Sequence, residues 1–183
     1  MKPLFTIHAG EYLVAEHIER AHPRWNVWVP SKDTGIDLLV TDARNRKTVS
    51  LQVKFSKDFS PGSGSLLVQN RLLARGWWTH DPDKIRNSKA DFWVFVLPSF
   101  VEKVVSFIVL PPAELLRRFK AIHGLGSRRV HSYLQVVKSG RCWEARGLSK
   151  ADQELVALDR FIDSDRDFTE FLDAWKPVAA RLK

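Results

Sequence analysis

Cysteine is almost absent from this sequence, and long hydrophobic runs are missing. Cys142 is the single cysteine among 183 residues, which excludes an internal disulfide and a zinc site built from several thiolates. No stretch approaches the roughly 18 apolar residues of a membrane-spanning helix. We therefore expect a soluble, unprocessed, cytoplasmic protein with no membrane partner.

The signatures of several enzyme classes are also missing. The six histidines never show the H-E-x-x-H spacing of zinc hydrolases, and the GSGS at 62–65 lacks the following Lys and Ser or Thr of a phosphate-binding loop. No G-x-G-x-x-G motif follows an expected strand. We expect no nucleotide cofactor.

The composition predicts a packed, basic domain. Hydrophobic residues make up 44% of the chain and charged residues 27%, and one domain over residues 1–183 is the default at this length. The net charge of +8 is uneven, because residues 61–150 carry 15 Lys and Arg against 6 Asp and Glu, whereas residues 151–183 carry 5 against 8. A basic surface attracts polyanions by releasing phosphate counterions, so nucleic acid is the leading partner; the alternative is a charge that only aids solubility.

Hydrophobic periodicity predicts an α/β fold, a central mixed sheet flanked by helices with extra helices at the C-terminus. Pro and Gly at 60–65 predict a loop. Expected helices cover 9–21, 68–74, 112–124 and one or two segments between 151 and 182. Expected strands cover 25–29, 36–42, 48–55, 90–98, 104–111 and 131–137.

The expected strand at 48–55 holds the main chemical candidates. Its apolar and polar residues alternate, so Gln52 and Lys54 project from one face. Alone, this Q-x-K pair also fits a half-exposed strand with one wet face. Asp37, at the entrance of the preceding strand, would come close to both in a hairpin. Glu11 would join them if the first helix packs across that hairpin.

These four residues suit phosphodiester hydrolysis. The carboxylates of Asp37 and Glu11 and the amide oxygen of Gln52 are ligands that suit Mg²⁺ or Mn²⁺. A metal-bound water has a lowered pKa, and Lys54 beside it can orient or help deprotonate this nucleophile while stabilising charge on the phosphorane. The predicted catalytic set is therefore Glu11, Asp37, Gln52 and Lys54, with the first three as metal ligands.

The same segments carry a family resemblance. GEYLVAEHI, VPSKDTGIDLLV, LQVKFS and ADFWVFVLP resemble the PD-(D/E)XK nuclease superfamily, in its variant with Gln in the third motif. The resemblance covers roughly residues 8–98 and implies a restriction-endonuclease-like core of a helix, a three-stranded meander, a helix and a further strand. It also implies a metal-dependent DNA endonuclease, and a homodimer is one option because many such nucleases use two active sites for two strands.

Two departures from the family pattern leave alternatives open. Gly35 and Ile36 stand where Pro often precedes the Asp, and Gln52 removes one negative charge, which lowers the expected metal affinity. A second hypothesis is therefore a catalytically decayed nucleic-acid-binding or protein-interaction module on the same fold. A third is a structural subunit whose acidic C-terminal helices bind a partner. Asp33 is a further candidate ligand, although we favour a turn role.

Arg and Trp residues after the third strand are candidate nucleic-acid contacts. Guanidinium groups hold phosphates and aromatic rings stack on unpaired bases. The alternative is that one or both tryptophans lie in the core. The predicted contacts are Arg71, Arg75, Trp77 and Trp78, with weaker candidates, most of them expected to be merely solvated, at Arg117, Arg118, Lys120, Arg128, Arg129 and His131.

Overall fold

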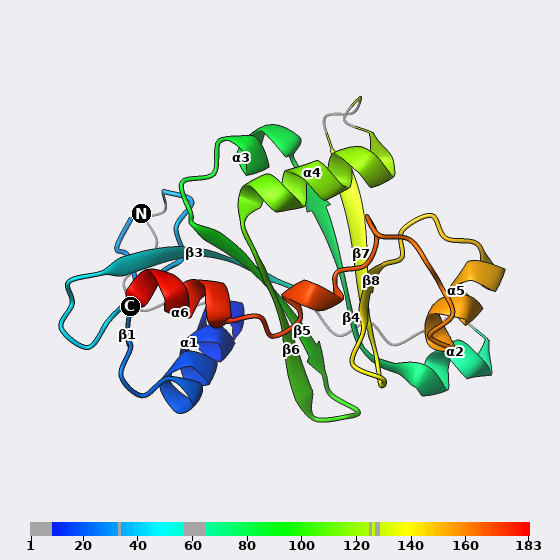
Figure 1. Cartoon of the computed structure of the whole chain (residues 1–183), viewed down its shortest axis with the longest axis horizontal. Helices are drawn as coiled ribbons and strands as arrows, with labels where there is room; N and C mark the ends of the chain where they lie inside the picture. The colour runs from blue at the N-terminus through cyan, green and yellow to red at the C-terminus, as the bar shows by residue number, and fades with distance from the viewer. Residues whose placement is uncertain (1–8, 33, 57–64, 125, 127–128) are drawn as a thin grey trace.

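Two β-sheets form the centre of the molecule (Figure 1). The computed structural model describes residues 9–32, 34–56, 65–124, 126 and 129–183. The five-stranded sheet has the order β1-β2-β3-β5-β6, with β1 Asn26–Trp28, β2 Leu38–Thr41, β3 Thr48–Phe55, β5 Phe92–Ser99 and β6 Val104–Leu110. The three-stranded sheet has the order β4-β7-β8, with β4 Leu72–His80, β7 Val130–Val137 and β8 Cys142–Glu144.

Helices surround these sheets, so the predicted α/β fold with a mixed sheet flanked by helices is confirmed. None of the helices in the described ranges is long and apolar enough to cross a membrane. Their bounds are α1 Ala9–Ala21, α2 Leu66–Arg71, α3 Pro82–Arg86, α4 Pro112–His123, α5 Lys150–Ala157, the short 3-10 helix η1 Thr169–Phe171 and α6 Lys176–Leu182.

The first three strands form an antiparallel meander, and β3 then pairs in parallel with β5. The tight turn between β2 and β3 depends on Asp42, whose Oδ1 accepts the amides of Arg46 and Lys47 at 2.7 and 2.8 Å. Asn45 occupies the left-handed region, at φ 55°, where Asn is tolerated better than most residues. This turn fixes the register in which β2 meets β3.

The chain between β3 and β5 contains a strand that the sequence pattern did not predict. The helix expected at 68–74 is confirmed over 68–71 and wrong beyond that, because α2 ends at Arg71 and the chain continues directly into β4, which pairs with β7. Ala74 and Trp78 of β4 are buried while Trp77 is exposed. Gly76 fits this strand because a Cβ there would lie 2.2 Å from the Trp78 ring, a distance no side chain tolerates.

The five-stranded sheet is covered on both faces, as the apolar pattern of β5 predicted. Helices α1 and α6 lie on one face, seen at the left of Figure 1, where Val14, Ile18 and Val178 pack against Leu51 and Val53 of β3. The other face packs against α4 and the second sheet. That core contains Trp93, Phe95, Ile108, Leu115, Phe119, Leu134 and Val136.

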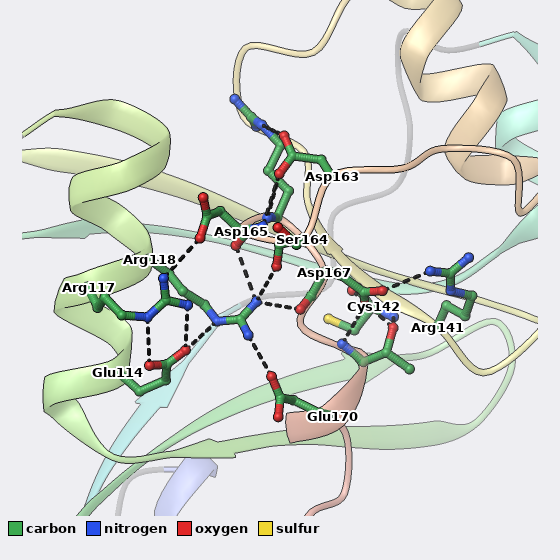
Figure 2. A network of polar contacts seen from close by, with 12 residues as sticks. Glu114, Arg117, Arg118, Arg141, Cys142, Asp163, Ser164, Asp165, Asp167 and Glu170 are labelled. Atoms are coloured by element: carbon green, nitrogen blue, oxygen red, sulfur yellow. Dashed lines mark hydrogen bonds and ion pairs between the residues drawn. The ribbon is translucent and has the colours of Figure 1, made fainter.

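The C-terminal region is less helical than the sequence predicted. Residues 158–168 connect α5 to η1 without forming a helix, and side chain and backbone groups from elsewhere in the fold bond part of this segment. Arg118 of α4 donates through Nη1 to the carbonyls of Ser164, Asp165 and Asp167 (Figure 2), and the amide of Phe168 donates to Cys142. Of the helical segments expected between 151 and 182, the structure has α5, the short η1 and α6.

Candidate functional site

The β2–β3 hairpin fixes Asp37 beside Gln52. The amide of Asp37 donates to the carbonyl of Leu51 at 2.8 Å, and its Oδ2 accepts the amide of Val53 at 2.7 Å. Leu51 and Val53 flank Gln52 in the sequence. The backbone and carboxylate of Asp37 therefore bracket Gln52 from the neighbouring strand, and the Val53 amide helps to orient the carboxylate.

Gln52 and Lys54 lie on one face of β3 and line a cavity of about 370 Å³. Gln52 pairs with Trp93 of β5, and Lys54 pairs with Phe95. The Nζ atom of Lys54 lies 4.9 Å from the centre of the Trp93 ring, a favourable cation–π distance. Both polar side chains are thus half-buried at the wall of one cavity.

The rest of the cavity wall comes from the end of β4, from α3 and from the segment before β7. Lys84 and Arg129 add positive charge to that of Lys54. Asp81 is the one acid among the described lining residues, and its Oδ1 already accepts the amide of Asp83 at the start of α3. This cavity therefore favours an anionic ligand.

His80 is a functional candidate that the sequence analysis missed. It is buried on β4, lines the same cavity, and its Nε2 lies 2.9 Å from the Ser132 hydroxyl. Burial, followed by the positive charges of Lys54 and His131, lowers the pKa of His80 to about 3. At neutral pH His80 is therefore an uncharged hydrogen-bonding group beside Lys54. Alternation within β4, in phase with Trp78, was the signal that could have found it.

Glu11 lies at the end of β3. A Cβ on Gly10 would lie 2.6 Å from the Cβ of Phe55, so the first turn of α1 contacts the last residue of β3 directly. Glu11 is 4% exposed. However, α1 packs on the Leu51 and Val53 face, which is opposite to the face of Gln52 and Lys54. Helix α1 therefore packs against the hairpin as expected, but on its apolar face. Neither Glu11 nor Asp37 is among the described residues that line the cavity.

The donor atoms of the predicted site fit a hard divalent cation. Two carboxylates, Asp37 and Glu11, and the Gln52 amide oxygen are the ligand types that Mg²⁺ and Mn²⁺ prefer. The described residues contain no group of three His, Cys, Asp or Glu side chains that could hold a metal ion. That finding is compatible with a site whose third ligand is an amide.

The predicted nucleic-acid contacts have different surroundings. Arg71 ends α2 on the surface. Arg75 donates to the Tyr133 hydroxyl at 2.5 Å. Trp77 is 43% exposed, whereas Trp78 is 7% exposed and packs edge-on against Phe95. Trp78 is therefore a core residue, which was the alternative to a nucleic-acid contact, whereas Trp77 is accessible to a ligand.

Among the weaker candidates, Arg117 and Arg118 bind acidic side chains of the protein itself. Arg118 is buried and therefore serves the fold, whereas Arg117 is half-exposed and its role as a phosphate contact stays a prediction. Asp33 and Arg128 lie outside the described residues. Comparison with known proteins adds no identification, since no family model, curated protein or solved structure matches the chain.

Proposed function

We propose that this protein is a divalent-metal-dependent nuclease that hydrolyses phosphodiester bonds, acting on DNA as an endonuclease. The observation that carries the proposal is the Asp37 carboxylate held against β3 beside Gln52, with Lys54 of the same strand in a cationic cavity. The order of elements adds support. Helix α1, the meander β1-β2-β3, the crossover and the parallel strand β5 follow the order that the PD-(D/E)XK resemblance implies.

Each residue of the site has a separate role. Asp37, Glu11 and Gln52 would hold the metal ion, and a bound Mg²⁺ or Mn²⁺ supplies a water of lowered pKa and neutralises phosphate charge. The Val53 amide fixes the Asp37 carboxylate in place. The ammonium of Lys54 stabilises the negative charge that the phosphate gains as the water attacks.

A binding module without catalysis is the second candidate. It is favoured by the cavity lining, where Lys54, Lys84 and Arg129 outnumber the single described acid and where Asp37 and Glu11 do not reach. Such a cavity binds a phosphate without any metal. This candidate predicts salt-sensitive binding to nucleic acid and no metal-dependent product.

The two candidates separate in a cleavage assay. Wild type, Asp37→Asn and Lys54→Ala are incubated with supercoiled, linear and single-stranded DNA in Mg²⁺, Mn²⁺ or chelator. We expect the wild type to nick DNA only when metal is present, and each variant to nick it at least about 100-fold more slowly. A loss of this size is typical of removing one electrostatic catalytic group. Cleavage that survives both changes overturns the assigned site. Binding without cleavage under every condition favours the second candidate.

Matched controls come from the other end of the same hairpin. Asp42→Asn removes a carboxylate that accepts backbone amides, as Asp37→Asn does, and Lys47→Ala removes an exposed lysine. Both controls should cut at the wild-type rate once folded. A loss in Asp42→Asn equal to that in Asp37→Asn would attribute the effect to hairpin stability instead of chemistry.

A further inference from the structure

Trp77 and His131 form an exposed aromatic surface on the outer face of the second sheet. Their rings are parallel within 10°, with centroids 5.6 Å apart, and Trp77 is 43% exposed. The Thr79 hydroxyl lies 3.0 Å from His131 Nδ1 and holds the imidazole in this orientation. We call Trp77, Thr79 and His131 the aromatic platform.

The platform borders the candidate site. Thr79 belongs to both, because it also lines the cavity that contains Gln52 and Lys54. The amide of Trp77 donates to the hydroxyl of Ser56 at 3.0 Å, and Ser56 lies two residues after Lys54. The cationic cavity and the exposed indole are therefore neighbours, tied together through the end of β3.

An exposed indole beside a cationic cavity matches the chemistry of an unpaired nucleotide. The base offers a flat aromatic face, and its phosphate offers negative charge next to that face. Within a duplex each base face is already stacked on its neighbours, so a protein side chain cannot cover it. The two tryptophans that line the cavity, Trp78 and Trp93, are 7% and 3% exposed, whereas Trp77 beside it is 43% exposed and accessible for stacking.

We propose that the aromatic platform stacks an unpaired base while the adjoining cavity binds its phosphate, so that the preferred substrate contains a single-stranded segment. This inference rests on the proposed function, or on its binding-only alternative, for the identity of the anion in the cavity. It adds the substrate class: single-stranded, frayed or branched nucleic acid in preference to blunt duplex.

Binding measurements in chelator test the platform without cleavage. Fluorescence anisotropy is recorded with labelled oligothymidylate, oligouridylate and a blunt duplex of equal length, at one fixed salt concentration. Trp77→Ala should weaken binding to the single strands roughly tenfold, the effect of losing one stacked base. Trp77→Phe should retain most of the affinity because a phenyl ring still stacks. Duplex binding should change little.

A second half-exposed tryptophan provides the control. Trp28 of β1 is 50% exposed and does not line the cavity, so Trp28→Ala should bind single strands as wild type does. Affinity for oligothymidylate alone means that the site reads the deoxyribose or the thymine methyl group of DNA, and affinity for both strands means that it reads neither. Unchanged single-strand binding in Trp77→Ala, or equal losses on strand and duplex, overturns the inference.

Cleavage in Mg²⁺ separates this inference from the proposed function. If wild type cuts nothing but Trp77→Ala still loses single-strand affinity, the nuclease fails and the platform stands. If cleavage depends on Asp37 but Trp77→Ala cuts strand and duplex in the wild-type ratio, the platform fails and the nuclease stands. Thermal unfolding of Trp77→Ala and Trp77→Phe checks that each variant is folded when it is tested.

Discussion

Arg118 and Lys54 are both cations set against aromatic rings, but their surroundings differ. The Arg118 guanidinium lies 5.1 and 4.8 Å from the rings of Phe168 and Phe171, and its nitrogens donate to Glu114, Glu170 and three backbone carbonyls (Figure 2). Lys54 lies over Trp93 and faces a cavity. The first cation is enclosed by acceptors of the protein, whereas the second is placed where a ligand can reach it.

The electrostatics of the two regions follow from this difference. The hydrogen bond from Arg117, with further help from Arg118, lowers the pKa of Glu114, so cations and acid in that cluster stabilise one another. At the cavity, burial and then the charge of Lys54 lower the pKa of the neighbouring His80. In the first region cations and acids pair with one another, whereas the described lining of the cavity has three cations and one acid. This contrast separates a structural polar cluster from a binding site.

The largest expected effect on stability comes from breaking the region where cations and acids pair. Arg118→Met keeps the aliphatic volume but leaves two carboxylates and three backbone carbonyls without this donor, which should lower the free energy of unfolding by about 3 kcal/mol. Urea denaturation measures this loss. Arg117 is the matched control: its side chain is 53% exposed, so Arg117→Met should lower the free energy of unfolding far less than Arg118→Met does. Equal losses at the two positions would mean that the burial of Arg118 adds nothing to its contribution to stability.

The hairpin that carries the site was predictable because its determinants are local. The alternation at 48–55 gave the bounds of β3, and the polar turn behind Thr41 gave the antiparallel pairing. Asp37, Gln52 and Lys54 then followed from the register of two consecutive strands. The position of Glu11 at the end of β3 was not predictable, because it depends on which face of the sheet α1 covers.

The elements that complete the cavity could not be predicted locally. Strand β4 pairs with β7, 50 to 65 residues away, and an irregularity between Leu72 and Ala74 shifts the register of this pairing. His80 and Arg129 reach the cavity only through this distant pairing. The connection at 158–168 was not predictable for a similar reason, because the Arg118 guanidinium that binds carbonyls of this segment comes from α4.

A smaller effect should appear as the pH dependence of stability. Because burial and Lys54 lower the pKa of His80 to about 3, against an ordinary value of 6.5, the unfolded chain binds more protons between these pH values. Stability is therefore full above pH 6.5 and falls as the pH falls. From pH 7 to pH 5 His80 alone should cost about 2 kcal/mol.

Substitution of His80 shows whether this residue causes the pH dependence of stability. His80→Gln can keep a hydrogen bond to Ser132, and it should flatten the dependence of unfolding free energy on pH below 6.5. His22 is a less buried histidine, and its pKa is also lowered by burial, so His22→Gln should flatten the curve less. Urea denaturation across this pH range gives both curves, and parallel curves for wild type and His80→Gln would contradict a neutral, buried His80.

The smallest expected effect concerns the salt dependence of binding. If Lys84 contributes to the phosphate site, Lys84→Ala should reduce the slope of log affinity against log salt concentration by about one, since one phosphate contact is lost. Lys150, at the start of α5 and outside the described cavity lining, is the control whose removal should leave the slope unchanged. Equal slopes for wild type and Lys84→Ala would mean that this positive charge serves the fold, as Arg118 does. A reduced slope at Lys84 alone would instead show that the cavity charge is directed at a polyanion.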